Sequence, residues 1–398
     1  NILAKNLIVV TAGFLCWYVF GYAFAFGAPA EDANRFMGYK NMFMTEFWAS
    51  KSMFRFWVFQ GAFCATGATI VSGAMAERTQ LKGFSIYTAV LTSLVYPVVV
   101  YWGWSGEGAL WYTDDAGEDV SVVGPALIDF AGSGIVHMVG GVGALCGAII
   151  VGPRKDRFDE TKAHEFEAHS IPFCVIGTFF LWFGWYGFNA GSTGSMHDKA
   201  TANTAGLVAV NTTMAPCAAG LVVFILRRFV VAPKLLDVGG FCNGILGGLV
   251  SITAGCAVME PWESVVIGIF GGIFYQLGSM LLKRLKVDDV VDAFPVHGVC
   301  GLWGIIACGC FGNPDEGNGG NGLFYFRDGA GKQLGTQLFA AFIIVLWVGV
   351  LSVLVFLPLR ILSALRLTDH FQDKGADIME HSPSKAYSAD AKVNGAEA

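Results

Sequence analysis

Long apolar segments limit what this chain of 398 residues can fold into. A helix that crosses a bilayer needs about 20 predominantly apolar residues, and segments of this kind recur ten times along the sequence. Only 14% of the residues are charged, whereas soluble domains contain about 25%. Backbone polar groups must be satisfied inside lipid, which favours helices, and the alternating strands of a membrane β-barrel are not seen. The sequence therefore predicts an all-α polytopic membrane protein.

The ten predicted spans cover residues 4–27, 55–75, 83–103, 130–152, 171–190, 205–226, 238–256, 262–282, 294–311 and 335–365. The last span is longer than a bilayer is thick and contains Pro358, so we expect it to tilt or to leave the bilayer as a bent helix. From about residue 367 the sequence becomes polar, which predicts a solvated, partly disordered tail. We therefore divide the chain into a transmembrane domain, 1–366, and a C-terminal tail, 367–398.

Lysine and arginine residues indicate the orientation, because short loops that are rich in them stay in the cytoplasm. Such residues recur in alternate loops, for example Arg78 with Lys82 and Arg154 with Lys155. The loop at 104–128, in contrast, contains five acids and no lysine or arginine. Ten spans then place both ends of the chain in the cytoplasm.

Charge and cysteine usage exclude several functions. The net charge of −6 includes no basic footprint of the kind that binds nucleic acid. None of the ten cysteines falls in a CxxC pair, so we interpret them as buried, inert thiols. Nucleophile-and-base, phosphate-loop and HExxH motifs are missing. The sequence predicts a protein that is not an enzyme and has no cofactor or metal.

Two histidines lie inside apolar spans, where an ionisable side chain costs several kcal/mol unless it lines a cavity or finds a partner. His137 lies in DFAGSGIVHMVGGVG, and His297 lies in VDAFPVHGVCGLWG, 160 residues later. Each span is rich in glycine and follows an acid, Asp129 or Asp292. Two halves in inverted orientation would bring both imidazoles to the midplane. The alternatives are two unrelated core histidines, or a haem or metal ligand pair, although neither histidine belongs to an HxxxH or HxxE cluster.

Aromatic side chains form the next group: Phe59, Phe63, Trp104, Trp185 and Phe188. Core packing and interfacial belts explain most aromatic residues in membrane proteins. A tryptophan ring with a nearby hydroxyl, such as that of Ser192, is also able to hold a small monovalent cation. Asp129 is interpreted either as a helix N-cap or as a support for such an outer cation site.

Several stretches together resemble the ammonium transporter (Amt/Mep/Rh) family over nearly the whole chain. They are GAMAERTQ at 73–80, DFAGSGIVHMVGG at 129–141, LWFGWYGFNAGS at 181–192, CNGILGGLVSITAGCAVMEPW at 242–262 and VHGVCGLWG at 296–304. The AERTQ, EPW and WFGWYGFN forms resemble the plant-like eukaryotic ammonium transporters more than the Rhesus glycoproteins. The resemblance implies two inverted five-helix halves followed by a long final helix.

The resemblance also implies roles for individual residues. His137 and His297 would be the paired pore histidines that relay a proton. Phe63 and Phe188 would be the stacked phenylalanines that close the outer pore, with Phe59 above and Trp185 beside them. Trp104 and Ser192 would recruit ammonium, supported by Asp129. The family forms homotrimers with one pore per subunit, and we expect a plasma-membrane protein with a cytoplasmic C-terminus.

Some positions depart from the family pattern. Family members have eleven spans and an outside N-terminus, so the first family span is expected to be missing from a chain that starts at Asn1. Tyr101 stands where many relatives have histidine, and Met379 stands where plant relatives have a phosphorylatable threonine. The expected function is electrogenic transport of NH4+, and of methylammonium, as NH3 plus a relayed proton. A sensor with little flux and an electroneutral NH3 channel remain the alternatives.

Overall fold

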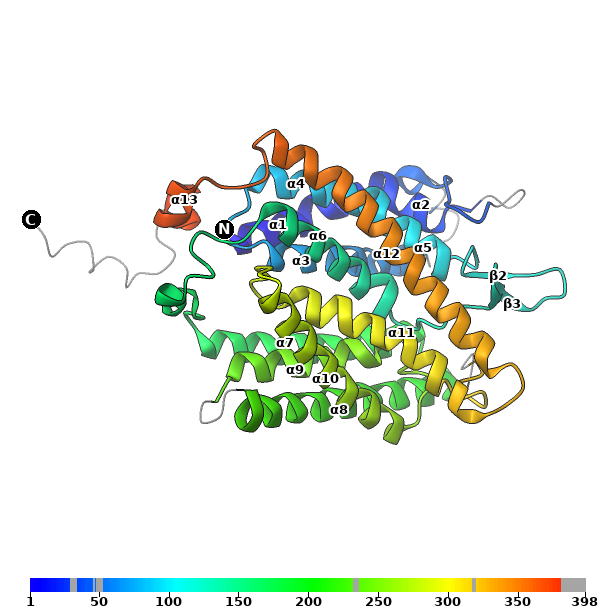
Figure 1. Ribbon diagram of the computed structural model, residues 1–398. Helices are drawn as coiled ribbons and strands as arrows, with labels where there is room; N and C mark the ends of the chain where they lie inside the picture. The colour runs from blue at the N-terminus through cyan, green and yellow to red at the C-terminus, as the bar shows by residue number, and fades with distance from the viewer. Residues whose placement is uncertain (29–33, 46, 48–52, 232–235, 317–319, 381–398) are drawn as a thin grey trace, which may run out of the picture.

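The computed structural model describes residues 1–28, 34–45, 47, 53–231, 236–316 and 320–380. Its helices run roughly alongside one another through the molecule (Figure 1). The N-terminus and the short helix α13 (Asp369–Lys374) lie at one end, here named the tail end. The strands β2 (Trp111–Thr113) and β3 (Asp119–Ser121) lie at the opposite end, here named the hairpin end.

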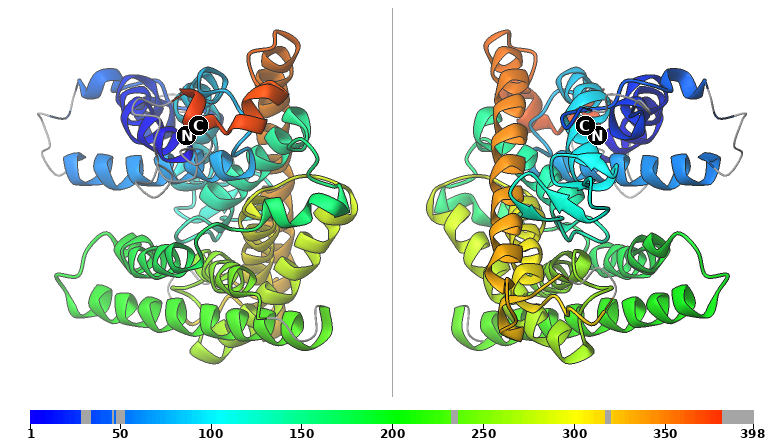
Figure 2. Two further views of the ribbon diagram at one scale, coloured as in Figure 1. Left: turned by 90° about the vertical axis from the view of Figure 1, so that its left-hand side faces the viewer. Right: turned by 90° about the vertical axis from the view of Figure 1, so that its right-hand side faces the viewer.

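Helices of the first half form one side of the bundle, in blue and cyan, and α7 and α8, in green, form the other (Figure 2). The first half contains α1 (Ile2–Cys16), η1 (Trp17–Gly21), α2 (Tyr22–Phe26), η2 (Met42–Met44), α3 (Met53–Ala74), α4 (Leu81–Val90), η4 (Leu91–Val95), α5 (Tyr96–Trp104), η5 (Ser133–Met138) and α6 (Val139–Val151). The rest contains η6 (Glu160–Phe166), α7 (Ile171–Asn189), η7 (Ala190–Thr193), α8 (Lys199–Ile225), η8 (Leu226–Val231), α9 (Val238–Thr253), α10 (Pro261–Arg284), η9 (Phe294–Val299), α11 (Cys300–Phe311), η10 (Leu323–Tyr325), α12 (Ala330–Ile361), α13 and α14 (Ala376–Glu380).

Each of the ten predicted segments coincides with a helix. In the part of the chain that the structure describes, eight helical runs are long and apolar enough to cross a membrane. The helices α3 and the shorter α9 occupy the other two predicted segments. The prediction of a helical membrane-spanning fold is therefore confirmed. The long α12 continues through Pro358 and runs obliquely to its neighbours (Figure 1).

Glycines allow the helices to approach closely. A Cβ atom on Gly268 of α10 would lie 2.2 Å from the carbonyl oxygen of Ala215 in α8, and one on Gly272 would lie 2.7 Å from that of Ala219. No side chain fits at such distances, so small residues are required where the two helices cross. The glycine-rich composition therefore has a direct packing role.

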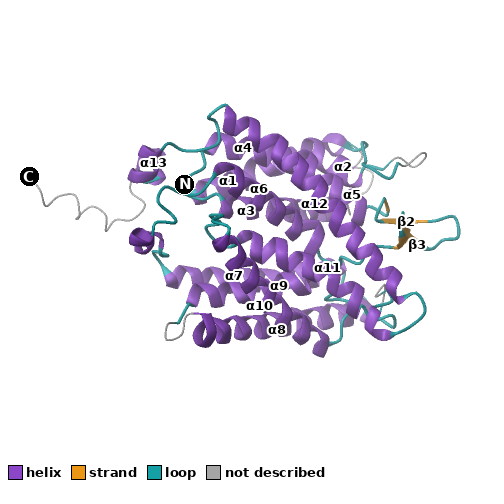
Figure 3. Cartoon of the chain, viewed as in Figure 1, coloured by secondary structure: helices purple, strands orange, loops and turns teal. Residues whose placement is uncertain are grey.

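Strands are short and confined to the hairpin end in the described part of the chain (Figure 3). The four strands β1 (Glu107–Gly108), β2, β3 and β4 (Gly124–Pro125) pair in sequence order, all antiparallel. The amide of Leu110 donates to the carbonyl oxygen of Trp102 at 2.9 Å, so this small sheet is fixed to the end of α5.

The start of the predicted tail is ordered. Leu365 and Leu367 are buried, and the amide of Leu367 donates to the carbonyl oxygen of Arg78 at 2.8 Å. These contacts lead into α13 and α14, which end at Glu380. The two leucines bury apolar surface that a fully solvated segment would expose. Residues 381–398, which make up most of the predicted tail 367–398, lie outside the described residues.

Candidate functional site

The two intramembrane histidines meet in the centre of the bundle. Nδ1 of His137 lies 3.1 Å from Nδ1 of His297, and the two rings are nearly parallel with centroids 5.1 Å apart. One Nδ1 must carry the proton of this hydrogen bond while the other accepts it. The pair therefore shares a single proton between two rings that lie 160 residues apart in the sequence.

Asp129 fixes the backbone that carries His137. Its buried carboxylate accepts hydrogen bonds from the amides of Gly132, Gly134 and Ile135 at 2.8–3.0 Å. These amides open the π-helical segment η5, whose first donors have no partner within the helix. Gly132 has φ of +102°, a conformation that favours glycine. The side chain of Asp129 therefore caps the first amides of η5, whereas the N-cap position itself is Gly132.

Asp289 is the counterpart of Asp129 in the second half. It accepts hydrogen bonds from the amides of Ala293 and Phe294 at 2.9 and 2.7 Å, at the start of the π-helical segment η9. Asp289 precedes His297 by eight residues, the same spacing as Asp129 and His137. The sequence analysis instead took Asp292 as the acid that precedes the span of His297. In the structure Asp292 accepts hydrogen bonds from the hydroxyl groups of Tyr275 and Ser279, both at 2.8 Å. The repeated eight-residue spacing was the signal that would have identified Asp289.

The two histidine-bearing segments pack backbone against backbone. A Cβ atom on Gly141 of α6 would lie 2.2 Å from the amide nitrogen of Gly298 and 2.8 Å from the carbonyl carbon of His297. Ser133 adds a second link, because its Oγ donates to the carbonyl oxygen of Val250 and accepts from the amide of Ala254, both at 2.7 Å. The position of each imidazole is therefore set by main-chain contacts between the halves.

Aromatic rings continue the path toward the hairpin end. The rings of Phe63 and Phe188 lie 4.4 Å apart at 75°, edge to face rather than parallel, and Phe59 contacts Phe63 at 4.7 Å. Phe188 also lies 5.2 Å from the ring of His137. The structure thus brings the three phenylalanines and the histidine pair into one continuous series of ring contacts, part edge to face and part parallel, here named the aromatic stack.

Two tryptophans flank this stack. The indole of Trp185 lies parallel to His137, 5.0 Å away, and its Nε1 donates to Oγ1 of Thr253 at 2.9 Å. The indole of Trp104 lies 5.5 Å from Phe63, and its Nε1 donates to the carbonyl oxygen of Asp129 at 2.8 Å. Thr253 was not predicted, because nothing in the sequence links it to a residue 68 positions away.

Ser192 lies beside the same stack. Its Oγ donates to the carbonyl oxygen of Phe188 at 2.8 Å, within the short 3-10 helix η7. The hydroxyl proton is therefore committed, and the oxygen lone pairs remain as acceptors. All nine residues expected at the site are joined through direct contacts with the phenylalanines, the histidine pair or Asp129.

A cavity of about 530 Å³ lies against the histidine pair. Its lining includes His137, His297, Trp185 and Phe188, together with residues of α1, α3 and α9. Among the residues that the structure describes, Nε2 of His137 is buried and has no hydrogen-bond partner. A buried polar atom without a partner is costly, which makes this nitrogen available to a ligand.

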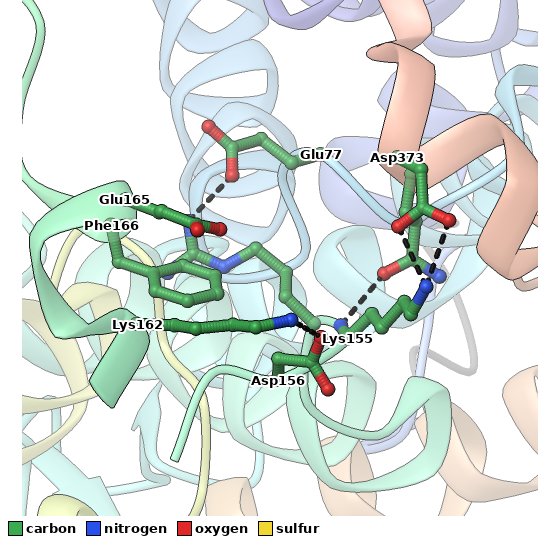
Figure 4. Close-up of a pocket in the computed structure, with 9 residues that line it drawn as sticks. Glu77, Lys155, Asp156, Lys162, Glu165, Phe166 and Asp373 are labelled. Carbon is green, nitrogen blue, oxygen red and sulfur yellow. Dashed lines mark hydrogen bonds and ion pairs between the residues drawn. The ribbon is translucent and has the colours of Figure 1, made fainter. Parts of the chain in front are cut away.

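A charged network closes the tail end. Arg154 donates from Nε and Nη2 to the carboxylate of Asp288 at 2.9 and 3.0 Å, and from Nη1 to Glu77. Burial acts to raise the pKa of Asp288, but the hydrogen bonds from Arg154 and the charges of Arg78 and Arg154 outweigh it, so the pKa lies below its ordinary value. Figure 4 shows the small cavity beside this network, where Lys155 pairs with Asp373 of α13 at 2.8 Å.

These features define a class of protein. Apolar helices long enough to cross a membrane surround a cavity in which two histidines share a hydrogen bond beneath an aromatic stack, which is the architecture of a membrane transport protein. The sequence profile of the Ammonium Transporter Family matches residues 1–387, and the chain belongs to this family.

Individual relatives agree with this assignment. The chain is 38% identical to ammonium transporter 1 member 2 of Arabidopsis thaliana, over 96% of this chain and 76% of that protein. It is 40% identical to the putative ammonium transporter 1 member 5 of the same plant, over 96% and 78%. Among solved structures, a sensor Amt protein superimposes with a TM-score of 0.79 at 31% identity, covering 95% of this chain and 89% of that one. Mep2 of Saccharomyces cerevisiae gives 0.77 at 25% identity, covering 92% and 80%.

Proposed function

We propose that this protein moves ammonium through the bundle as NH3 plus a separately relayed proton, with net transfer of NH4+. The observation that carries the proposal is the hydrogen bond of 3.1 Å between His137 and His297, directly beneath the pair of Phe63 and Phe188. Methylammonium, which also carries a dissociable proton, is the second expected substrate.

Electrostatics favours splitting the ion. A bare monovalent cation is costly in a medium of low dielectric constant, whereas NH3 is small and neutral. Loss of a proton near the phenylalanines therefore lowers the barrier for the nitrogen. K+ has no proton to lose, so the same section rejects it.

The histidine pair supplies a route for the proton. Nε2 of His137 has no partner in the structure and accepts the proton from NH4+. The proton that the two Nδ1 atoms share then shifts toward His297, which releases one from its own Nε2. Imidazole suits this step because one of its nitrogens accepts a proton while the other donates one. The released proton rejoins NH3 beyond the pair, so charge and atoms balance.

Recruitment takes place above the phenylalanines. The ring of Trp104 attracts a cation through its face, and Oγ of Ser192 offers only lone pairs because its proton is committed to Phe188. Asp129 holds Trp104 through its carbonyl oxygen and η5 through its carboxylate. Its role at the recruitment site is therefore one of support.

We assign the tail end to the cytoplasm and the hairpin end to the outside of the plasma membrane, and the distribution of lysine and arginine supports this orientation. We assign residues 1–366 to transport and 367–398 to regulation. The ion pair of Lys155 with Asp373, and the hydrogen bond of 3.0 Å from the Lys155 amide to Gln372, fix α13 against the loop after α6.

Family membership further supports a homotrimer with one path per subunit. On α7, Phe179 and Phe183 lie outside the cavity and are 62% and 77% exposed, so this part of the helix requires a lipid or protein neighbour. Native mass spectrometry of the purified protein should give the mass of three chains. A monomer alone would contradict the trimer without affecting the proposed transport path.

The transport proposal is tested in cells that lack their own ammonium transporters. Wild type should support methylammonium uptake and give an ammonium-evoked current, and His137→Ala and His297→Ala should lose the current or its selectivity over K+. Unchanged current and selectivity in both variants would refute the relay. Uptake without current would favour electroneutral NH3 passage, and absence of uptake would favour a sensor. Phe188→Ala, which opens the section above the pair, should weaken discrimination against K+.

A further inference from the structure

One wall of the cavity that lies against the histidine pair is polar. Thr66, Thr69 and Ser72 of α3 line the cavity, along with Asn6 of α1. They follow Phe63 along α3 as this helix runs from the hairpin end to the tail end (Figure 1). A spacing of three residues corresponds to about 4.5 Å along a helix. Three hydroxyl groups therefore mark successive depths between the phenylalanines and the tail end.

Each of these hydroxyl groups has already committed its proton. Oγ1 of Thr66 donates to the carbonyl oxygen of Ala62 at 2.9 Å, and Oγ1 of Thr69 donates to Oδ1 of Asn6 at 2.9 Å. Oγ of Ser72 donates to the carbonyl oxygen of Thr69 at 2.7 Å and lies 3.2 Å from Oδ1 of Asn6. A hydroxyl group has one proton and two lone pairs. The three groups consequently offer acceptors to the cavity.

A row of acceptors selects the chemistry of its ligand. NH4+ has four N–H donors and no acceptor, so it is complementary to hydroxyl oxygens whose protons point elsewhere. An anion would find no donor on these oxygens. The rest of the lining is mainly apolar, for example Phe180, Leu181 and Val296, apart from Asn6, Asn243 and the histidine pair, so α3 contributes every hydroxyl group of this lining.

We propose that Thr66, Thr69 and Ser72 form an inner ammonium-binding track on the cytoplasmic side of the histidine pair. This inference rests on the proposed transport function and extends it. The track binds the ion after NH3 has regained its proton, and it binds ammonium that enters from the cytoplasm. The apolar section that the nitrogen must cross as NH3 then ends near His297.

A structural role is the competing explanation, because hydrogen bonds from Thr69 and Ser72 to Asn6 also join α3 to α1. Thr66 separates the two explanations. Its hydroxyl group bonds only within its own helix, so its removal does not break a contact between helices. An effect of Thr66 on binding from one side only is not expected from a role in packing.

The experiment compares the single variant Thr66→Val with wild type, and then adds Thr69→Val to it. Flux of radiolabelled methylammonium is measured in right-side-out and inside-out membrane vesicles, which makes the readout independent of charge transfer. The half-saturating concentration from the cytoplasmic face should rise by about fivefold to tenfold, as loss of hydrogen bonds to a charged ligand implies. From the outer face it should remain unchanged. Ser72→Ala should act in the same direction.

Thr11→Val is the matched control. Thr11 lies on α1, is exposed, and bonds only to the carbonyl oxygen of Leu7 at 2.7 Å, so it should leave both values unchanged. Equal half-saturating concentrations in wild type and Thr66→Val, or an equal shift from both faces, would overturn the track while leaving transport in place. Absence of wild-type flux would overturn the transport proposal and the track together.

Discussion

Trp185 and Thr253 form a hydrogen bond of 2.9 Å that holds an indole ring parallel to His137. Both side chains are buried, and the bond joins α7 to the end of α9. The threonine hydroxyl in turn donates to the carbonyl oxygen of Leu249 at 2.7 Å. The ring that supports the histidine pair therefore depends on a residue outside the aromatic stack.

Thr253→Val should lower transport, because it leaves the indole N–H buried without a partner at a cost of about 1–3 kcal/mol and frees the ring to turn away from His137. Thr253→Ser keeps the oxygen and should restore transport. The measurements are methylammonium uptake and thermal unfolding of the purified protein. If the valine and serine variants transport equally well, the hydrogen bond has no role in positioning the ring.

Asp289→Ala should destabilise the protein by about 1 kcal/mol, as loss of a side chain that accepts hydrogen bonds from the first helix amides does. It should also reduce ammonium-evoked current by displacing His297. Asp289→Asn keeps an acceptor oxygen, so its stability and its ammonium-evoked current should lie between those of Asp289→Ala and wild type. Asp114→Asn is the control, because Asp114 accepts amide hydrogen bonds from Ala116 and Glu118 in an exposed turn. Normal current in Asp289→Ala would show that the backbone holds His297 without this carboxylate.

Gly141→Ala should nearly abolish transport, because its methyl group would overlap the amide of Gly298 and force the histidine-bearing segments apart. Overpacking of this kind costs about 1–3 kcal/mol or more. Gly177→Ala on α7 is a suitable control, since no atom lies within 4 Å of the added carbon. Uptake and melting temperature should be measured together. A stable Gly141→Ala protein with normal uptake would contradict the close backbone contact.

Stability should fall in acid through Asp288. Its pKa in the folded protein lies below the ordinary value, so its contribution is fully present above the unfolded pKa of about 4 and is lost as pH falls through the folded pKa. Asp288→Asn should therefore be less stable at pH 7 and should lose less stability on acidification. Thermal unfolding at several pH values measures both effects. Parallel curves for the two proteins would contradict the assignment to Asp288.

Asp373→Asn provides the comparison for the acid experiment. Asp373 pairs with Lys155 at the exposed surface, where ion pairs contribute between about 0 and 1 kcal/mol. Its removal should leave the pH dependence of unfolding nearly unchanged. A large change would place the acid-sensitive contact at α13 rather than at Arg154.

Hydropathy predicted most of the fold, because a span must be apolar over a length that the bilayer determines. The same reasoning predicted His137 and His297, since an ionisable side chain is rare inside such a span. Asp289 was passed over in favour of Asp292, which is nearer to His297 in sequence. The π-helical turns η5 and η9 were not predicted either, because hydrophobic patterns do not separate an inserted residue from a regular helix.

Polar contacts between segments that are distant in the sequence were the second kind of feature that the sequence did not predict. Thr253 meets Trp185 only through the packing of α7 on α9. The hydroxyl row of α3 has no sequence signature, because Thr66, Thr69 and Ser72 are scattered among apolar residues and become related only along the cavity wall. Ordering of residues 369–380 depends on Leu367 reaching Arg78, a contact across the tail end. In each case the missing information was which helices are neighbours.

The contact between Gly141 and Gly298 also limits which movements the two halves can make during a transport cycle. Two backbones that touch with no side chain between them leave no compressible layer in which the halves could rock or slide. A cycle that opens first to one side and then to the other would have to break this contact at each turnover. Transport through a path that stays formed avoids that step. The transport rate then depends on the movement of the ion and its proton rather than on domain motion.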